Sequence, residues 1–222
     1  MTRRTDTGMP WPSPEDTPQT YWDAFHGGLD VPDQIPTPNP LLVEEASRLP
    51  TGSALDLGCG TGGDAIGLAG LGWRVTAVDV SGEVLRRAEL HAGRGGVQVD
   101  WQRHDLTETF PTGRYDLVCS QFLHSPTERP GQRTAILRRA LDAVAPGGSL
   151  LVIGHADIPA SMTGTPFDVD LPGPGELRAA LDPDPAVWTV AAERTVDRGT
   201  VTGPDGEPFA RADTVLRLVR AG

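Results

Sequence analysis

The sequence predicts an α/β fold, a Rossmann-like seven-stranded sheet that is mostly parallel, with a C-terminal antiparallel hairpin and helices on both faces. Short apolar runs alternate with segments of helical periodicity through the middle of the chain, which is typical of a parallel sheet. The first of these runs leads directly into a glycine-rich turn. Two more apolar runs end the chain, and a joint of roughly 15 residues between them favours an antiparallel hairpin at the sheet edge.

Two helices are predicted ahead of the sheet. Thr17-Pro18 and Asn39-Pro40 each place a capping residue before a proline, the usual signature of a helix start. The first helix would carry the aromatic residues of 21–25, and the second would run to Leu49 and stop at Pro50. We expect residues 1–50 to form a lead and helices that cover the active site, and residues 51–222 to form one compact domain.

The remaining elements follow from the apolar runs. Five parallel strands are predicted, at Ser53–Leu57, Arg74–Asp79, Val97–Arg103, Tyr115–Ser120 and Ser149–Gly154. Pro146-Gly147-Gly148 is expected to end the helix that precedes the fifth strand. In the tail we predict a helix at Glu176–Leu181, strands at Trp188–Val196 and Thr214–Val219, and a loop at Asp197–Ala212 between those strands.

Composition limits the classes of partner. The 222 residues carry a net charge of −11, and the arginines are dispersed among acids, which argues against a nucleic-acid partner. No apolar stretch approaches the ~20 residues of a membrane helix, and because the N-terminus is polar we expect no secretory signal there. Cys59 and Cys119 form no metal-ligand spacing, so no metal is expected and a cytoplasmic location fits best. The oligomeric state stays open, and the favoured partner is a small molecule.

The glycine loop Gly58-Cys59-Gly60-Thr61-Gly62-Gly63 is the clearest functional signal. Glycines allow a tight turn and a close approach of the backbone to a ligand, and the following helix N-terminus favours an anionic group. The same spacing serves dinucleotides and S-adenosylmethionine. Asp56 favours S-adenosylmethionine over a dinucleotide, because a carboxylate at this position would repel a pyrophosphate but suits the ammonium group of a methionine moiety.

Two more acids follow the next two strands. Asp79 lies about 20 residues after the first glycine, the position from which an acid accepts hydrogen bonds from ribose hydroxyls. Asp105 follows the third strand and could accept from an adenine amino group. Each has a plainer interpretation, Asp79 as a cap for the helix that begins near Ser81 and Asp105 as an ordinary loop residue.

These residues together resemble a known family. Leu55–Gly62 is similar to motif I of class I S-adenosylmethionine-dependent methyltransferases, Asp79 to their ribose-binding acid and Asp105 to their adenine-contacting acid. Tyr115–Val118 resembles their fourth strand, and Ala145–Leu150 their turn into the fifth. The resemblance extends more weakly to tellurite-resistance and thiopurine-type members. It implies S-adenosylmethionine as cofactor, S-adenosylhomocysteine as product, and SN2 methyl transfer to an O, N, S or C nucleophile of a small molecule. The cofactor-binding residues that it implies are Asp56, Gly58, Cys59, Gly60, Asp79, Val80, Asp105, Leu106 and Gln121.

A catalytic base is optional in this chemistry, because positioning alone can supply much of the rate. His124, after the fourth strand, is the first candidate, and His155, after the fifth, faces the same sheet edge. Trp22, Phe25 and His26 either pack a helix or form a lid, and Met162 and Phe167 could line an acceptor pocket. Two alternatives stay open, an NAD-linked oxidoreductase and a non-catalytic S-adenosylmethionine-binding module.

Overall fold

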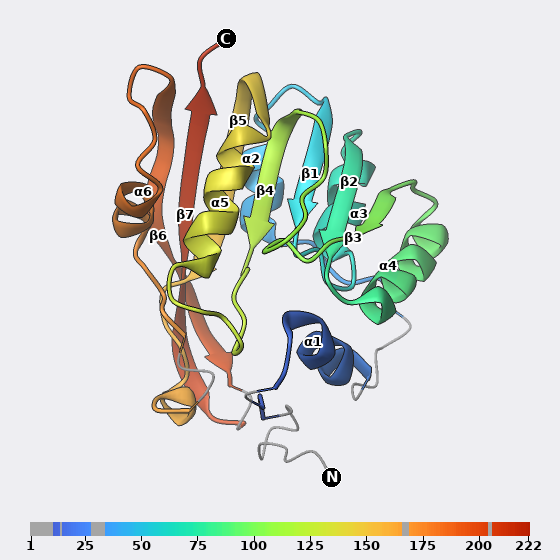
Figure 1. The fold of residues 1–222 in the computed structure, drawn as a ribbon, viewed down its shortest axis with the longest axis vertical. Helices are drawn as coiled ribbons and strands as arrows, with labels where there is room; N and C mark the ends of the chain where they lie inside the picture. Colours follow the sequence, from blue (N-terminus) through green and yellow to red (C-terminus); the bar gives the residue numbers. More distant parts are fainter. Residues whose placement is uncertain (1–10, 14, 28–33, 166–168, 204–205) are drawn as a thin grey trace.

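The computed structural model describes residues 11–13, 15–27, 34–165, 169–203 and 206–222. It contains a seven-stranded sheet in the order β3-β2-β1-β4-β5-β7-β6, in which only the pairings of β7 with β5 and β6 are antiparallel (Figure 1). The predicted fold class is therefore confirmed.

The elements follow one another as the sequence predicts. The strands are β1 (Ser53–Leu57), β2 (Arg74–Asp79), β3 (Asp100–Arg103), β4 (Tyr115–Gln121), β5 (Val144–His155), β6 (Trp188–Thr202) and β7 (Pro208–Arg220). The α-helices are α1 (Pro18–Gly27), α2 (Pro40–Ala46), α3 (Gly63–Gly70), α4 (Gly82–Gly95), α5 (Gln132–Asp142) and α6 (Pro174–Leu181). A short 3-10 helix, η1 (Ala160–Met162), follows β5.

Helices cover both faces of the sheet because successive side chains of a strand point to opposite faces. Leu55 and Leu57 of β1 belong to the core that α5 and α6 close. Ala54, one residue before Leu55, points to the opposite face and belongs to the second core, with α2 and α3. The central strands are buried on both faces, as parallel strands usually are. Asp56 shares the face of Ala54, so its carboxylate lies inside the second core.

Helix starts agree with the capping residues seen in the sequence. The Asn39 side chain accepts a hydrogen bond from the Leu41 N–H at 2.9 Å, and Pro40 opens α2. Ser81 accepts from the Val84 N–H and begins α4. The α2 helix ends at Ala46 rather than Leu49, because the next residues form turns instead of continuing the helical hydrogen bonds.

Two of the parallel strands differ from the prediction at their starts. Val97 still donates its N–H to the last turn of α4, so the ladder of β3 begins only at Asp100. Pro146-Gly147-Gly148 does not separate α5 from β5 but forms an irregularity inside β5. Gly148 is required there, because a Cβ would come within 2.9 Å of the Asp116 carbonyl oxygen.

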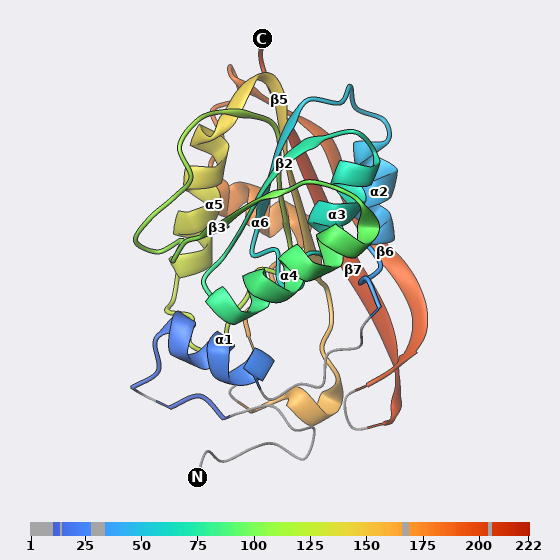
Figure 2. The same ribbon diagram turned by 90° about the vertical axis from the view of Figure 1, so that its right-hand side faces the viewer.

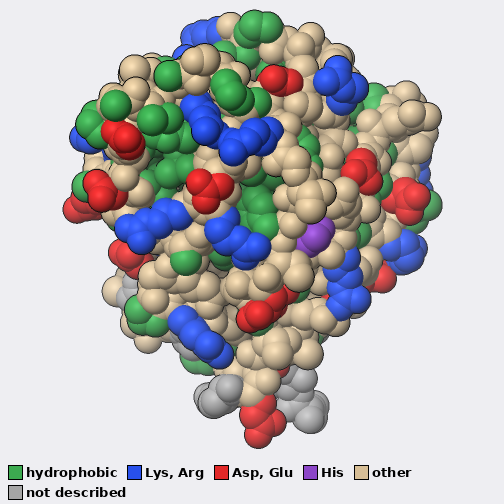
Figure 3. All heavy atoms as spheres, turned by 45° about the horizontal axis from the view of Figure 1, so that its top comes forward, with side chains coloured by type: hydrophobic (Ala, Val, Ile, Leu, Met, Phe, Trp, Pro, Cys, Tyr) green, Lys and Arg blue, Asp and Glu red, His purple; other side chains and the backbone are tan. Residues whose placement is uncertain are grey.

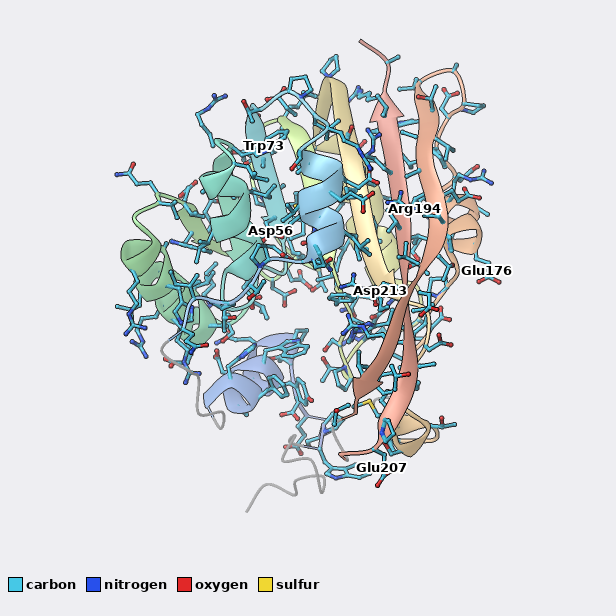
Figure 4. The ribbon with its side chains drawn as sticks, turned by 180° about the vertical axis from the view of Figure 1, so that it is seen from behind. Asp56, Trp73, Glu176, Arg194, Glu207 and Asp213 are labelled. Carbon is cyan, nitrogen blue, oxygen red and sulfur yellow. The ribbon has the colours of Figure 1, made fainter. Side chains whose placement is uncertain are left out.

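The predicted loop at Asp197–Ala212 is wrong. Thr200–Thr202 pairs with Pro208–Ala210, so β6 and β7 continue as a long hairpin. A register shift between Asp197 and Thr200 interrupts the ladder, with Gly199 at φ 72°. This end of the hairpin extends past the carboxyl ends of the parallel strands (Figures 1 and 4). It therefore adds side chains to the edge of the sheet where ligands bind in open α/β folds.

The N-terminal helix lies at the same edge. Figures 1 and 2 place α1 beyond the carboxyl ends of the parallel strands. The Ser81 hydroxyl, at the start of α4, donates to the Asp23 carboxylate of α1 at 2.5 Å. A helix and an extended hairpin thus flank the loops that follow the strands.

The charged surface shows no single-sign patch on the face drawn in Figure 3, where basic and acidic side chains are interspersed. Glu45 of α2 is a buried charge, 1% exposed, that meets Arg194 at 2.8 Å and Arg217 at 2.9 Å. These ion pairs join α2 to β6 and β7. Among the described residues, no helix combines the length and apolar character needed to span a membrane.

Candidate functional site

A cavity of about 230 Å³ lies between the glycine loop, the carboxyl ends of the strands and α1. Its walls include the predicted residues Gly58, Gly60, Asp79, Val80, Asp105, Leu106 and His124, and the α1 residues Trp22 and His26. The topology explains this convergence, because β1, β2, β3 and β4 are parallel neighbours and their following loops meet at one edge.

The glycine loop presents backbone to the cavity. Gly58 and Gly60 have φ values of 75° and 52°, in the left-handed region that side chains rarely adopt. The N–H groups of Gly58 and Cys59 both donate to the Val78 carbonyl at 2.9 Å, which fixes the turn against β2. No atom lies within 4 Å of the position of a Cβ at Gly60. The loop therefore leaves open space where a ligand could approach its backbone.

Asp79 has unused acceptor capacity. One of its carboxylate oxygens accepts from the Gly60 N–H and the other from the Ser81 N–H, each at 3.0 Å. A carboxylate offers about four acceptor positions, so two stay open for a ligand diol. Burial raises the pKa of Asp79, and the backbone hydrogen bonds partly oppose that rise. The residue both fixes the loop and faces the cavity.

Asp105 supplies a second carboxylate to the same cavity. One of its oxygens accepts from the N–H and the hydroxyl of Thr107, at 2.9 and 2.6 Å. Leu106 and Val80 add apolar surface to the cavity wall. A polar acceptor beside apolar side chains is the combination that a heteroaromatic ring with an amino group requires.

Three predicted residues lie behind the cavity rather than in its wall. Asp56 is 1% exposed, and Gln121 and Cys59 are each 8% exposed. The Cys119 thiol contacts one oxygen of Asp56 at 3.8 Å, and the other oxygen has no partner among the described residues. The Gln121 side-chain nitrogen is likewise buried without a partner in that part of the chain.

Asp56, Asp64 and Asp79 form an acidic cluster beneath the loop. Burial raises the pKa of Asp56 well above its ordinary value, and the negative charges of Asp64 and Asp79 add to that rise. Burial also raises the pKa of Asp64. One buried and two half-buried acids, all with raised pKa values, make this a favourable place for a ligand that carries positive charge. The same burial raises the pKa of the Cys59 thiol well above its usual range, so the thiol is not activated.

Two histidines at the cavity are held neutral. Burial lowers the pKa of His26 and of His124 to about 4 in each case. The Nδ1 atom of His26 and the Nε2 atom of His124 are buried with no partner among the described residues. His26 stacks on Trp22 with ring centroids 5.8 Å apart. Neutral imidazoles with unused hydrogen-bonding atoms can contact a cationic ligand without repelling it.

His124 also borders a second cavity, of about 380 Å³, under the extended hairpin. His155 and Met162 line this cavity, and Trp22 belongs to the walls of both cavities. Phe25 lines the second cavity only. Phe167, which the sequence suggested for an acceptor pocket, lies outside the described residues.

Sequence reasoning missed Asp213 and Arg211, both on β7. Asp213 is fully buried and lies 3.3 Å from the His155 Nδ1 atom, its register neighbour on β5. Arg211 contacts both oxygens of Asp213, at 3.1 and 3.2 Å. Figure 4 shows Asp213 on β7 near the carboxyl end of β5. The available signal was a charged residue just before the apolar run of β7, which the predicted loop obscured.

Comparison with known proteins gives one family. Residues 54–148 match the model of a methyltransferase domain. Over 139 residues the chain is 37% identical to a ubiquinone biosynthesis O-methyltransferase of Xanthomonas euvesicatoria pv. vesicatoria (strain 85-10). That match covers 60% of this chain and 54% of the relative, so the chain aligns with about half the length of the curated relatives it matches.

Solved structures agree over nearly the whole chain. A protein studied for the conversion of a disulfide bond into a thioacetal group during echinomycin biosynthesis has 27% identity and a TM-score of 0.68, over 91% of this chain and 93% of that one. TehB from Haemophilus influenzae has 17% identity and a TM-score of 0.65, over 92% of this chain and 67% of that one. At 17% identity, the likeness to TehB shows the fold alone.

Proposed function

We propose that this chain is a class I S-adenosylmethionine-dependent methyltransferase that acts on a small molecule, a proposal supported by its match to a methyltransferase domain over residues 54–148 and by its similarity to curated O-methyltransferases. S-adenosylmethionine is its cofactor, and S-adenosylhomocysteine is the product. The observation that carries the proposal is the single cavity in which the glycine loop, Asp79 and Asp105 meet.

The cavity residues fit the parts of the cofactor. The two unused acceptor positions of Asp79 would hold the ribose hydroxyls. Asp105 would accept from the adenine amino group, with Leu106 and Val80 against the ring. The open backbone at Gly58 and Gly60 would take the methionine end.

The acidic cluster would attract the cofactor through its charge. The cofactor carries a sulfonium and an ammonium group, and the potential from Asp56, Asp64 and Asp79 favours both. Asp56 would act through this potential rather than by direct contact, because it does not line the cavity. The side-chain nitrogen of Gln121, at the end of β4, has no partner among the described residues and would act on the methionine end of the site.

When bound, the cofactor supplies an electrophilic methyl group. The chain's contribution is then to hold the methyl group in line with the nucleophile and to exclude water, which can account for about 7–11 kcal/mol of the barrier in favourable cases. Trp22 and His26 on α1 cover the cavity and would act as its lid. We propose an oxygen nucleophile, supported by the curated O-methyltransferase relatives.

The test is titration calorimetry of the full chain with S-adenosylhomocysteine and, separately, with NADH. Binding of one S-adenosylhomocysteine per chain, with no heat from NADH, is the expected result. Tighter binding of NADH would contradict the proposal and favour an oxidoreductase. A screen for S-adenosylhomocysteine formation with pooled phenols, thiols, amines and acids then separates an enzyme from a binding module.

A further inference from the structure

We infer that the second cavity binds the methyl acceptor, an uncharged apolar molecule with one acidic hydroxyl or thiol, and that His155, oriented by Asp213, removes the proton from that group. This inference rests on the proposed function. It assigns the acceptor class and the base, neither of which follows from the cofactor site.

The second cavity has the size and lining of a site for an apolar small molecule. Its volume of about 380 Å³ lies in the usual range for ligand pockets. Tyr21, Phe25, Met162, Val201 and Phe209 line it. The charged residues on its wall are Asp157 and Arg211, of opposite sign, so the wall does not select a charged acceptor.

The two cavities meet where methyl transfer requires. Trp22 and His124 belong to the walls of both cavities. A methyl group held in the first cavity and a nucleophile held in the second would therefore approach each other beside these two side chains. His155 lies on the acceptor side, with its ring centroid 5.5 Å from that of His124.

His155 is held in one orientation by two contacts. Its Nδ1 atom lies 3.3 Å from the buried Asp213 carboxylate, and its ring stacks on Phe122 at 4.1 Å. Phe122 has a φ of 54°, a strained conformation for a bulky residue, and the Arg211 guanidinium lies 5.2 Å above its ring. When the Nδ1–H group of His155 donates to Asp213, the Nε2 atom of His155 is a hydrogen-bond acceptor. This Nε2 atom makes no hydrogen bond to any described residue.

The surroundings favour His155 over His124 as the base. Burial lowers the pKa of His124 to about 4, which makes it a weak proton acceptor at neutral pH. Asp213 stays ionised, because hydrogen bonds from His155 and Arg211 outweigh its burial and hold its pKa below the usual value. Arg211 and Arg198 share the Asp213 charge, so this carboxylate mainly fixes the imidazole tautomer. His155 also faces His124 and, across the cavity, Asp157.

The proton and electron balance is simple. The acceptor O–H or S–H proton moves to the His155 Nε2 atom, and the electron pair left on oxygen or sulfur forms the new bond to the methyl carbon. The bond between that carbon and the sulfonium breaks, and its electron pair stays on sulfur as a thioether. The imidazolium then releases its proton to water, and no oxidant, reductant or metal is needed.

The location is tested with 4-nitrophenol, whose ionised form absorbs visible light, in the presence of saturating S-adenosylhomocysteine. We expect saturable binding that Val201→Ser weakens several-fold. Val190→Ser is the matched control, because Val190 lies on the same strand and is 50% exposed outside the cavity. Absence of saturable binding, or equal loss in both variants, would overturn the assigned acceptor site.

The base is tested by the absorbance of the bound 4-nitrophenol and by its rate of methylation as functions of pH. His155→Gln should lower the ionised fraction of the bound phenol and reduce kcat by about 10²–10⁴-fold. The loss of rate on acidification should move from its wild-type position toward the ionisation of free 4-nitrophenol, because without the base the phenol must lose its proton unaided. S-adenosylhomocysteine affinity should stay within about twofold.

Asp213, as a positioning residue, is tested with Asp213→Asn and Asp213→Glu. Asp213→Asn should lower kcat more than it changes KM, and Asp213→Glu should recover part of the rate. If Asp213→Asn does not fold, the pH profile of His155→Gln is the measurement that tests the base. An unchanged pH profile in His155→Gln, with S-adenosylhomocysteine still bound, overturns the base while leaving the proposed function intact. Failure of the wild type to bind S-adenosylhomocysteine overturns the proposed function instead.

Discussion

Replacing Asp56 by asparagine should stabilise the unliganded protein and weaken its binding of the cofactor. Asp56 is 1% exposed, one of its oxygens has no described partner, and its nearby charges are the acids Asp64 and Asp79. Asparagine has nearly the same shape and cannot ionise. The substitution therefore removes a buried charge and leaves the packing of β1 unchanged.

The expected gain in unfolding free energy follows from the cost of burying a polar group without a hydrogen-bond partner, about 1–3 kcal/mol. The folded-state pKa of Asp56 is raised, so its stabilising contribution is complete at low pH and is lost as pH rises through that folded value. Asparagine shows no such loss. The stability of Asp56→Asn relative to wild type should therefore be near zero at acidic pH and grow to about 1–3 kcal/mol at pH 8.

Urea unfolding of both proteins at a series of pH values measures this difference, and calorimetry with S-adenosylhomocysteine measures the change in affinity. We expect the affinity at pH 8 to fall by about 10–100-fold, because the ammonium group loses a negative neighbour. Asp142→Asn, on the exposed surface of α5, is the control. A variant less stable than wild type at pH 8, with unchanged affinity, would refute the reasoning.

Three further substitutions test separate parts of the account. Asp79→Asn keeps one backbone hydrogen bond but loses the charge and part of the acceptor capacity of the side chain. Calorimetry should therefore show that S-adenosylhomocysteine binds more weakly by about 1–3 kcal/mol. Unchanged affinity in a folded variant would show that Asp79 does not hold the ribose. Glu45→Ala leaves Arg194 and Arg217 without their carboxylate partner and should lower the unfolding free energy measured in urea by about 3–5 kcal/mol. The control Glu44→Gln, at an exposed ion pair, should lower it by less than about 1 kcal/mol. Equal losses in the two variants would contradict the assignment of the buried network. The pKa of His26 is about 4 in the folded protein against 6.5 for the free side chain, so the stability that its neutral imidazole contributes is complete above pH 6.5 and is lost as pH falls. His26→Gln should therefore reduce the loss of unfolding free energy between pH 7 and pH 4 by on the order of 3 kcal/mol. The same loss in the variant and the wild type would show that His26 is not buried.

Much of the fold could be predicted where a local signal marks each boundary. The β1 and β2 strands begin and end at the predicted residues, because β1 lies between Gly52 and Gly58 and β2 ends at Asp79. The Asn39-Pro40 and Ser81 caps likewise mark real helix starts. Each of these signals acts within a few residues, so the chain alone contains it.

The long hairpin could not be predicted for the opposite reason. Its pairing joins Thr200 to Ala210 and Val201 to Phe209 across a segment rich in glycine, proline and charge. The register shift near Gly199 breaks the two-residue alternation that identifies a strand. The wrong loop mattered more for the site than for the fold. Arg211 lines the second cavity, and Asp213 contacts His155 of that cavity, only because β7 begins before Thr214.

In the cofactor site, too, some residues could be placed from the sequence and others could not. Residues at strand ends, such as Asp79 and Asp105, could be placed because parallel neighbours bring their carboxyl ends together. The depth of Asp56 could not, because burial depends on how α2 and α3 pack over β1. Spacing in the sequence identifies which residues gather at an edge, while packing decides which of them a ligand can touch.

A crystal structure of the full chain grown with S-adenosylhomocysteine tests the central claim most directly. We expect the ribose hydroxyls on the Asp79 carboxylate, the adenine beside Asp105 and Leu106, and the sulfur toward the wall formed by Trp22 and His124. Density for the ligand in any other cavity, or a ribose that makes no contact with Asp79, would contradict it.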